Sequence, residues 1–160
     1  MENLITLFES SLEFRLFALL ILGLCIGSFL NVVVYRLPIM LNKSWHNQCV
    51  ELLGDKCKLE PMEDKFTLSY PASHCPNCKA NVPWWSNIPL LGYTLLAGKC
   101  VACRKHISLR YPIVEILTGT LFVGAGWLYA DLVSIAWLVV YLAMIFCLML
   151  IDLDTFLLPD

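Results

Sequence analysis

Two Cys-x-x-Cys pairs are the residues of this chain whose types and spacing best suit a chemical role. The pairs are Cys75–Cys78 and Cys100–Cys103, and 21 residues separate them. Each pair presents two sulfurs from one tight turn, and two such turns can surround a zinc ion tetrahedrally. A site closed by four thiolates leaves no position for water, so the spacing predicts structural rather than catalytic zinc.

The other four cysteines receive no ligand role. Cys25 and Cys147 lie inside apolar runs, where a lone cysteine behaves as a small hydrophobic residue. Cys49 and Cys57 have no recognisable motif around them. We therefore expect no disulfide scaffold, and the paired pattern favours a metal site in a reducing compartment.

The composition is that of a membrane protein. Hydrophobic residues make up 59% of the 160 and charged residues 15%, whereas soluble domains average about 45–50% and about 25%. The net charge of −2 provides no overall basic field, so no nucleic-acid partner is expected. The N-terminus lacks a basic region followed by a small-residue cleavage site, so no removable signal peptide is predicted.

Three apolar runs are long enough to cross a bilayer, which takes about 20 helical residues. They are 16–35, between Arg15 and Arg36, then 113–130 and 133–151. Asp131 marks a turn so short that the last two runs must form an antiparallel hairpin. Gly23 and Gly27 form a small-xxx-small pattern, which either permits close helix packing or is the ordinary glycine content of a membrane helix.

A polar, cysteine-bearing insert separates the first run from the second. Seven prolines between positions 38 and 112 make long helices unlikely within it. Residues 40–53 could form a short amphipathic helix with Trp45 as an interfacial anchor. Residues 74–107 are expected to form short strands and turns around the metal.

Charge distribution predicts the topology. Ten of the eleven Lys and Arg residues lie between Arg36 and Arg110, where the net charge is +5. Because such residues stay on the cytoplasmic side, the chain is expected to be an all-α integral membrane protein with three transmembrane helices and a small cytoplasmic zinc-ribbon-like insert. Its parts would be a periplasmic N-terminus with the first helix (1–36), the zinc-binding domain (37–112) and a helical hairpin (113–160).

Four polar residues fall near the inner ends of the predicted helices: Asn31, Arg36, Glu115 and Asp152. Ionisable groups inside such segments usually face the protein interior or a wet cavity. Alternatively, Arg36 and Asp152 are simple interfacial flanks. Arg36 could pair with Glu115, which has apolar residues on both sides.

Asp152 and Asp154 do not form a catalytic pair. Two positions apart on a helix means roughly 200° around its axis, so the two carboxylates cannot face one site. An aspartic protease needs two carboxylates that share a proton, one acting as base and one as acid. If Asp152 is one of them, its partner must come from elsewhere.

Several motifs together resemble those of the type IV prepilin peptidases, which are integral-membrane aspartic proteases of bacterial inner membranes. The resemblance extends over about residues 16–160 and rests on five segments besides the cysteine pairs: Gly27-Ser-Phe-Leu-Asn-Val-Val-Val-Tyr-Arg-Leu-Pro38, Asn87-Ile-Pro89, Arg110-Tyr-Pro-Ile-Val-Glu115, Ile151-Asp152-Leu-Asp154 and Leu158-Pro-Asp160. It implies a multi-pass enzyme that cleaves the basic leader from type IV prepilins and type II secretion pseudopilins. The same enzymes methylate the new N-terminal residue with S-adenosylmethionine.

The resemblance also implies roles for individual residues. Asp152 is similar to the first catalytic aspartate, and the cysteine domain to the cytoplasmic zinc-binding insert of the family. Gly98 matches a position that the family associates with methylation, although a turn requiring positive φ would equally explain a glycine there.

The family's second catalytic aspartate, in a Gly-x-Gly-Asp motif on a later helix, does not occur in this sequence. The expectation is therefore an N-terminal portion, truncated before that aspartate and inactive alone as a protease, whose partner is the missing C-terminal half. The alternatives are a non-catalytic membrane adaptor that presents a zinc ribbon to a pilus or secretion partner, and a methyltransferase without protease activity. The presence of a second catalytic aspartate would distinguish the peptidase from the membrane adaptor.

Overall fold

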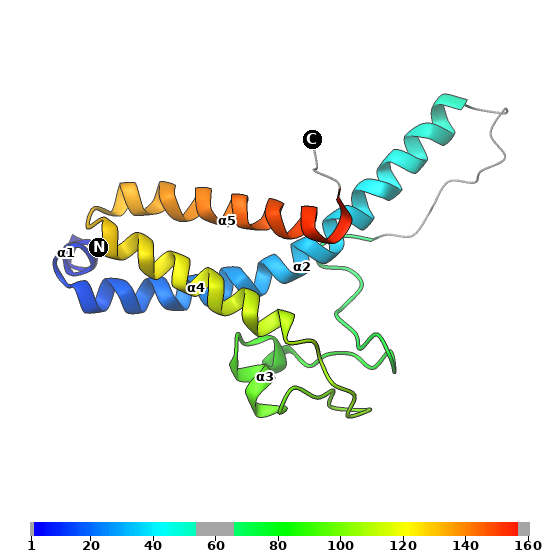
Figure 1. The fold of residues 1–160 in the computed structure, drawn as a ribbon, viewed down its shortest axis with the longest axis horizontal. Coiled ribbons are helices and arrows are strands. Elements are labelled where there is room, and N and C mark those ends of the chain that lie inside the picture. Colours follow the sequence, from blue (N-terminus) through cyan, green and yellow to red (C-terminus); the bar gives the residue numbers. More distant parts are fainter. Residues whose placement is uncertain (1, 54–65, 157–160) are drawn as a thin grey trace.

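The computed structural model describes residues 2–53 and 66–156 and is mostly helical (Figure 1). Three long helices lie side by side, and a small domain of loops hangs from one end of the bundle. The helical elements are α1 (Glu2–Ser10), α2 (Leu12–Leu53), the 3-10 turn η2 (Trp84–Asn87), α3 (Leu91–Leu95), α4 (Arg110–Leu128) and α5 (Leu132–Thr155).

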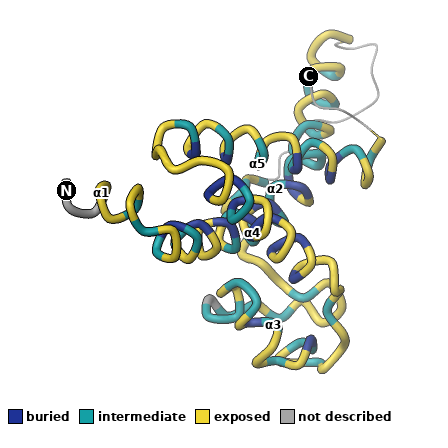
Figure 2. The backbone as a smooth tube through the Cα atoms, turned by 60° about the vertical axis from the view of Figure 1, so that its left-hand side comes forward, coloured by how far each residue is buried: buried dark blue, intermediate teal, exposed yellow. Residues whose placement is uncertain are grey.

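The three predicted membrane spans are confirmed as helices. Helices α2, α4 and α5 are each long and apolar enough to cross a membrane. Their contacting faces form two buried clusters, one around Val34, Val114 and Ile151 and one around Leu19, Phe122 and Ile135. The outer sides of α4 and α5 are largely exposed (Figure 2), as expected for surfaces that face lipid.

The hairpin is also confirmed. Only residues 129–131 separate α4 from α5, and the Asp131 carboxylate caps α5 by accepting a hydrogen bond from the Ser134 amide at 2.8 Å. Helix α4 begins at Arg110 rather than Ile113. Pro112 fits there because a first-turn proline removes no intrahelical hydrogen bond.

Glycines allow α2 and α4 to approach closely. A Cβ atom on Gly23 would lie 2.7 Å from Gly119 Cα, and one on Gly27 would lie 2.8 Å from Glu115 Cα. These distances are shorter than van der Waals contact and the obstructing atoms are backbone, so neither glycine tolerates a side chain without helix movement. The small-xxx-small pattern therefore serves close helix packing.

Gly23→Ala is expected to lower the free energy of unfolding in detergent by about 1–3 kcal/mol, because the added methyl forces the helices apart. Gly124→Ala is the matched control, since a Cβ there meets nothing within 4 Å. Alanine is the better helix former, so the control should be neutral or stabilising. Equal melting temperatures for the two variants would contradict the packing argument.

Helix α2 is longer than the sequence suggested. It continues through Pro38 to Leu53, so the expectation of no long helix in the insert is wrong for residues 38–53, and the short amphipathic helix is its continuation. Figure 1 shows that α2 changes direction between its blue first part and its cyan second part. A proline inside a helix removes one hydrogen bond and bends the axis, and here it does not end the helix.

A buried arginine ties the opposite end of the bundle together. Arg15 donates hydrogen bonds to the carbonyls of Phe8 and Glu9 in α1 and, at 3.0 Å, to that of Gly126 in α4. These carbonyls lie near helix C-termini, where a cation also offsets the helix dipole. Sequence analysis treated Arg15 only as a flank and did not anticipate α1.

The cysteine-bearing loops contain turns but no strands within the described residues. Two isolated antiparallel bridges, His74 with Asn81 and Lys99 with His106, stand where short strands were expected. Each bridge closes the turn that carries one cysteine pair.

Candidate functional site

The four paired cysteines converge on one point. Their sulfurs all lie within 4.8 Å of one another, with 3.9 Å between Cys75 and Cys103 and between Cys78 and Cys100. A tetrahedron with zinc–sulfur bonds of about 2.3 Å has edges of about 3.8 Å. The separations are far beyond the roughly 2.05 Å of a disulfide. This arrangement can hold a metal ion.

Hydrogen bonds prepare some of these sulfurs to be thiolates. Backbone N–H groups of Cys78 and Asn77 lower the pKa of Cys75 to about 6, and the Lys105 amide lowers the pKa of Cys103. The Ala80 amide lowers the pKa of Cys78, but burial and the neighbouring thiols outweigh it and raise that pKa to about 11. Four adjacent thiols cannot all ionise unless a cation balances them, which a bound metal would do.

A short chain of hydrogen bonds reaches one sulfur of the cluster. The Asn77 amide nitrogen lies 3.7 Å from Cys103 Sγ, and Lys105 Nζ donates to Asn77 Oδ1 at 3.0 Å. Such partners orient ligands and stabilise negative charge on sulfur.

Gly98 has a structural reason to be glycine. Its φ is +65°, and a Cβ atom would lie 2.6 Å from Tyr93 Oη. The Tyr93 hydroxyl donates to the Ile107 carbonyl, and the Ile107 amide donates to the Gly98 carbonyl at 2.8 Å. These contacts support the explanation that Gly98 is a glycine because the turn two residues before Cys100 requires one.

Glu115 anchors the loop domain to the helix bundle. It is buried in α4, and its carboxylate accepts a hydrogen bond from the Leu90 amide at 2.8 Å. Leu90 has φ 58°, a rare value for leucine, so this bond holds a strained position. The suggested pairing of Arg36 with Glu115 is wrong, because each binds a different loop.

Two polar residues of α2 make further contacts across the same junction. The Asn31 amide donates to the Tyr111 carbonyl of α4 at 3.2 Å and to the Gly27 carbonyl at 3.3 Å. The Ser28 hydroxyl donates to the Asn87 carbonyl at 3.5 Å. The segment from Asn87 to Leu90 is thus bound by both α2 and α4.

Arg36 holds a different stretch of the loop domain. It is buried, and its guanidinium donates to the carbonyls of Thr67 at 2.8 Å and Pro71 at 2.7 Å. It also lies 5.4 Å from the centre of the Phe66 ring, with Lys43 5.5 Å from the same ring. Arg36 is therefore more than a membrane-interface flank, since it binds the chain that leads to the first cysteine pair.

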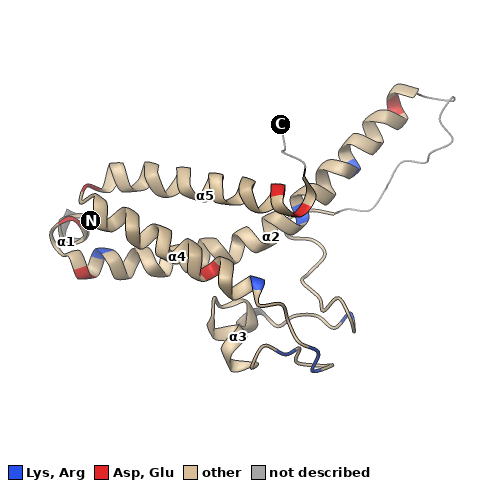
Figure 3. Ribbon diagram, in the orientation of Figure 1, with Lys and Arg blue, Asp and Glu red and all other residues tan. Residues whose placement is uncertain are grey.

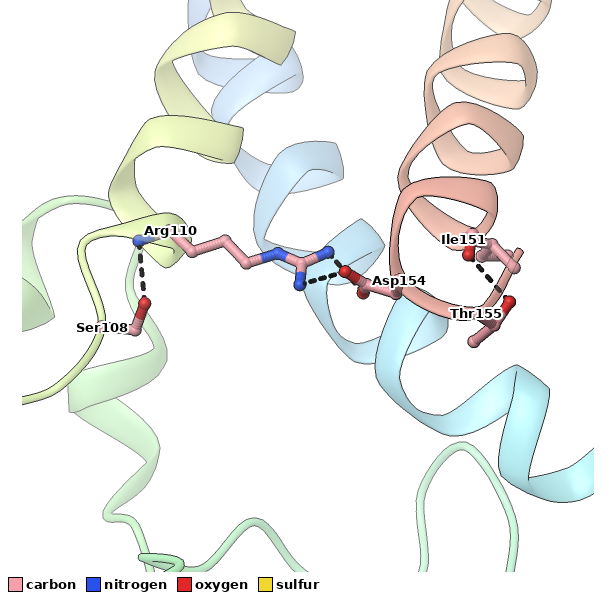
Figure 4. A network of polar contacts seen from close by, with 5 residues as sticks. All are labelled: Ser108, Arg110, Ile151, Asp154 and Thr155. Carbon is pink, nitrogen blue, oxygen red and sulfur yellow. Dashed lines mark hydrogen bonds and ion pairs between the residues drawn. The ribbon is translucent and has the colours of Figure 1, made fainter. Parts of the chain in front are cut away.

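Asp152 and Asp154 lie in the last turn of α5 with different surroundings. Asp152 is half-buried. Asp154 binds Arg110, the first residue of α4, through two hydrogen bonds of 2.7 and 2.6 Å (Figure 4). The Arg110 amide in turn donates to the Ser108 hydroxyl. Arg110 clamps the end of α5 to the start of α4 through Asp154 and not through Asp152.

The role of Arg110 was not foreseen from the sequence. It appeared only as the first residue of the Arg-Tyr-Pro segment, although a cation at the start of one span and an acid at the end of the adjacent antiparallel span are natural partners. The structure thus places the cysteine cluster in the loop domain. The other predicted site residues lie on the helix segments nearest to that domain: Asn31 and Arg36 on α2, Glu115 on α4 and Asp152 on α5.

Residues 21–129 match the model described as "Bacterial Peptidase A24 N-terminal domain". The chain belongs to this family. The match contains the cysteine cluster, its anchors on α2 and α4, and most of two spans, whereas Asp152 lies beyond it.

Curated relatives agree with this assignment. The chain is similar to proteins named "Prepilin leader peptidase/N-methyltransferase" from Legionella pneumophila, Pseudomonas putida and Neisseria gonorrhoeae, at 42%, 44% and 42% identity. The matches cover 86%, 88% and 88% of this chain and 47%, 48% and 49% of those proteins. The chain therefore spans about half the length of the curated relatives it matches. No solved structure shows significant similarity to it.

Proposed function

We propose that this chain supplies the membrane anchor, the metal domain and one catalytic carboxylate of an enzyme that cleaves leaders from type IV prepilins and type II secretion pseudopilins. The names of its relatives support this activity. The observation that carries the proposal is the half-buried Asp152 in the last turn of α5, whose neighbour Asp154 is bound to the helix that continues from the cysteine loops.

In this proposal Asp152 acts on water together with a second carboxylate. Asp154 and Glu115 are engaged by Arg110 and by the Leu90 amide, so neither is the natural partner. The second aspartate would come from a segment outside these 160 residues, and the chain alone would not cleave prepilin. The test is cleavage of a prepilin by this chain joined to the second half of the Legionella pneumophila relative.

The proposed metal is one structural zinc held by Cys75, Cys78, Cys100 and Cys103. It would keep the two loops closed, and with four sulfur ligands it would not activate water. Metal analysis should find one zinc per chain. Replacing either cysteine pair by serine should remove it and unfold the loop domain, because the metal supplies much of such a domain's folding energy. Intact disulfides within both pairs, without metal, would refute the proposal.

The names of the relatives also support a second reaction, methylation of the new N-terminus with S-adenosylmethionine as donor. Gly98 would act indirectly, by giving the loop before Cys100 its shape. Gly98→Ala should therefore act through the loop domain rather than on the bond that is cleaved.

The proposed location is the bacterial inner membrane, with residues 37–112 in the cytoplasm and the α4–α5 turn outside. The excess of Lys and Arg in the insert supports this orientation. In a background without other reactive thiols, Ala130→Cys should react with an impermeant reagent added to intact cells, whereas Ser69→Cys should not. The reverse pattern would invert the topology.

A further inference from the structure

The segment formed by η2, Ile88–Leu90 and α3 is apolar and lies against the membrane-spanning helices. Residues 84–98 contain no charged side chain, and they begin with two tryptophans, a residue type enriched at membrane interfaces. Three large apolar side chains on it are exposed: Ile88 at 42%, Leu91 at 57% and Leu95 at 73%. None of this surface is used by the metal site.

Two hydrogen bonds set the depth of this segment. Ser28, which binds Asn87, lies eight residues before Arg36, or about 12 Å along the helix. Glu115, which binds Leu90, lies five residues after Arg110, or about 8 Å. Both anchors are deeper than the arginines that mark the interface. Figure 1 shows α3 below the first turns of α4.

The surrounding charge favours an anionic surface. Residues 66–109 contain four cations and no Asp or Glu: Lys79, Lys99, Arg104 and Lys105. Figure 3 shows blue but no red on the loops below the helix bundle. An apolar ridge with adjoining cations is the combination with which interfacial elements bind anionic lipid, with the apolar side about 5–10 Å into the leaflet.

We infer that η2 and α3 are a membrane-inserted element of the loop domain. Ile88, Leu91 and Leu95 lie in the acyl-chain boundary of the leaflet on the cysteine-cluster side, and Lys79, Lys99, Arg104 and Lys105 face its anionic headgroups. The loop domain is thus seated in the bilayer at a fixed depth. This inference does not depend on the proposed peptidase activity.

Site-specific fluorescence tests it on the zinc-loaded chain. The four unpaired cysteines are replaced by serine, and an environment-sensitive label is attached to Leu95→Cys or Leu91→Cys, with Ala72→Cys as control. Ala72 is exposed and follows Pro71, which Arg36 holds near the end of the apolar run 16–35 of α2. Samples are reconstituted in vesicles of phosphatidylethanolamine and phosphatidylglycerol, and retained zinc verifies that the domain is folded.

Lipid-attached nitroxides should quench the labels at 91 and 95 several-fold more than the label at 72, and aqueous iodide should show the opposite order. Replacing phosphatidylglycerol by phosphatidylcholine should weaken the lipid quenching. Equal iodide access at 72, 91 and 95 would overturn the inference. Protection from both quenchers would also overturn it, because protein and not lipid would then cover α3. Quenching that is indifferent to lipid charge would refute the role of the cations.

Discussion

Replacing Asp152 by asparagine is expected to abolish prepilin cleavage in a completed enzyme, in which this chain is joined to the second half of the Legionella pneumophila relative. Asparagine preserves the size of the side chain but can neither accept nor return a proton. General acid–base catalysis contributes about 100- to 10,000-fold, so the loss should be at least of that order. The measurement is the mobility shift of a prepilin substrate in detergent or membranes.

The 160-residue chain by itself is the control for this experiment. It should bind zinc and insert into membranes but leave prepilin uncut. Processing by the chain alone at a rate comparable to the completed enzyme would show that a later aspartate is not needed. A completed enzyme that folds and binds zinc but never cleaves would favour the adaptor alternative.

The membrane spans could be predicted because bilayer thickness acts directly on sequence. A helix of about 20 apolar residues is long enough to cross the hydrocarbon core, and the three predicted runs lie in α2, α4 and α5. The metal cluster was predictable for a similar reason, since zinc geometry demands two tight sulfur-bearing turns. In both cases the constraint is local in the chain.

The contacts that seat the loop domain were not predictable in the same way. Glu115 and Arg36 were recognised as unusual, but their partners are main-chain groups at Leu90, Thr67 and Pro71, and every residue carries such groups. Charge pattern instead suggested that the two side chains pair with each other. Only the three-dimensional structure of the loops shows that Glu115 and Arg36 bind the backbone of two different loop segments.

The length of α2 shows how neighbours can outweigh a local rule. Pro38 predicts a helix end, yet the residues on both sides of it stay helical. Arg36 is buried under the Phe66–Pro71 segment, with Lys43 against the Phe66 ring, so tertiary contacts support the helix just before and just after the proline. Helical stability in proteins comes mainly from such packing rather than from propensity.

Arg110→Gln is expected to slow prepilin cleavage by about 10- to 100-fold in the completed enzyme, with little change in KM. Arg110 holds the last turn of α5 through two short bonds to Asp154. Without them the end of α5 is free to shift, and a misplacement of about 1 Å can cost about 100-fold in rate. The matched control is Arg104→Gln, which removes the same charge from an exposed position between the second cysteine pair and α4.

A positioning role differs from a general structural one in its mutational coupling. Asp154→Asn should produce a similar loss of kcat, and the double variant Arg110→Gln/Asp154→Asn should be no slower than either single variant, because all three break one contact. The exchange Arg110→Asp/Asp154→Arg should recover part of the rate. Zinc content should stay at the wild-type level throughout, since the cysteine cluster lies outside this contact. Additive losses, or zinc release by Arg110→Gln alone, would show that Arg110 supports the fold of the loop domain and does not position Asp152.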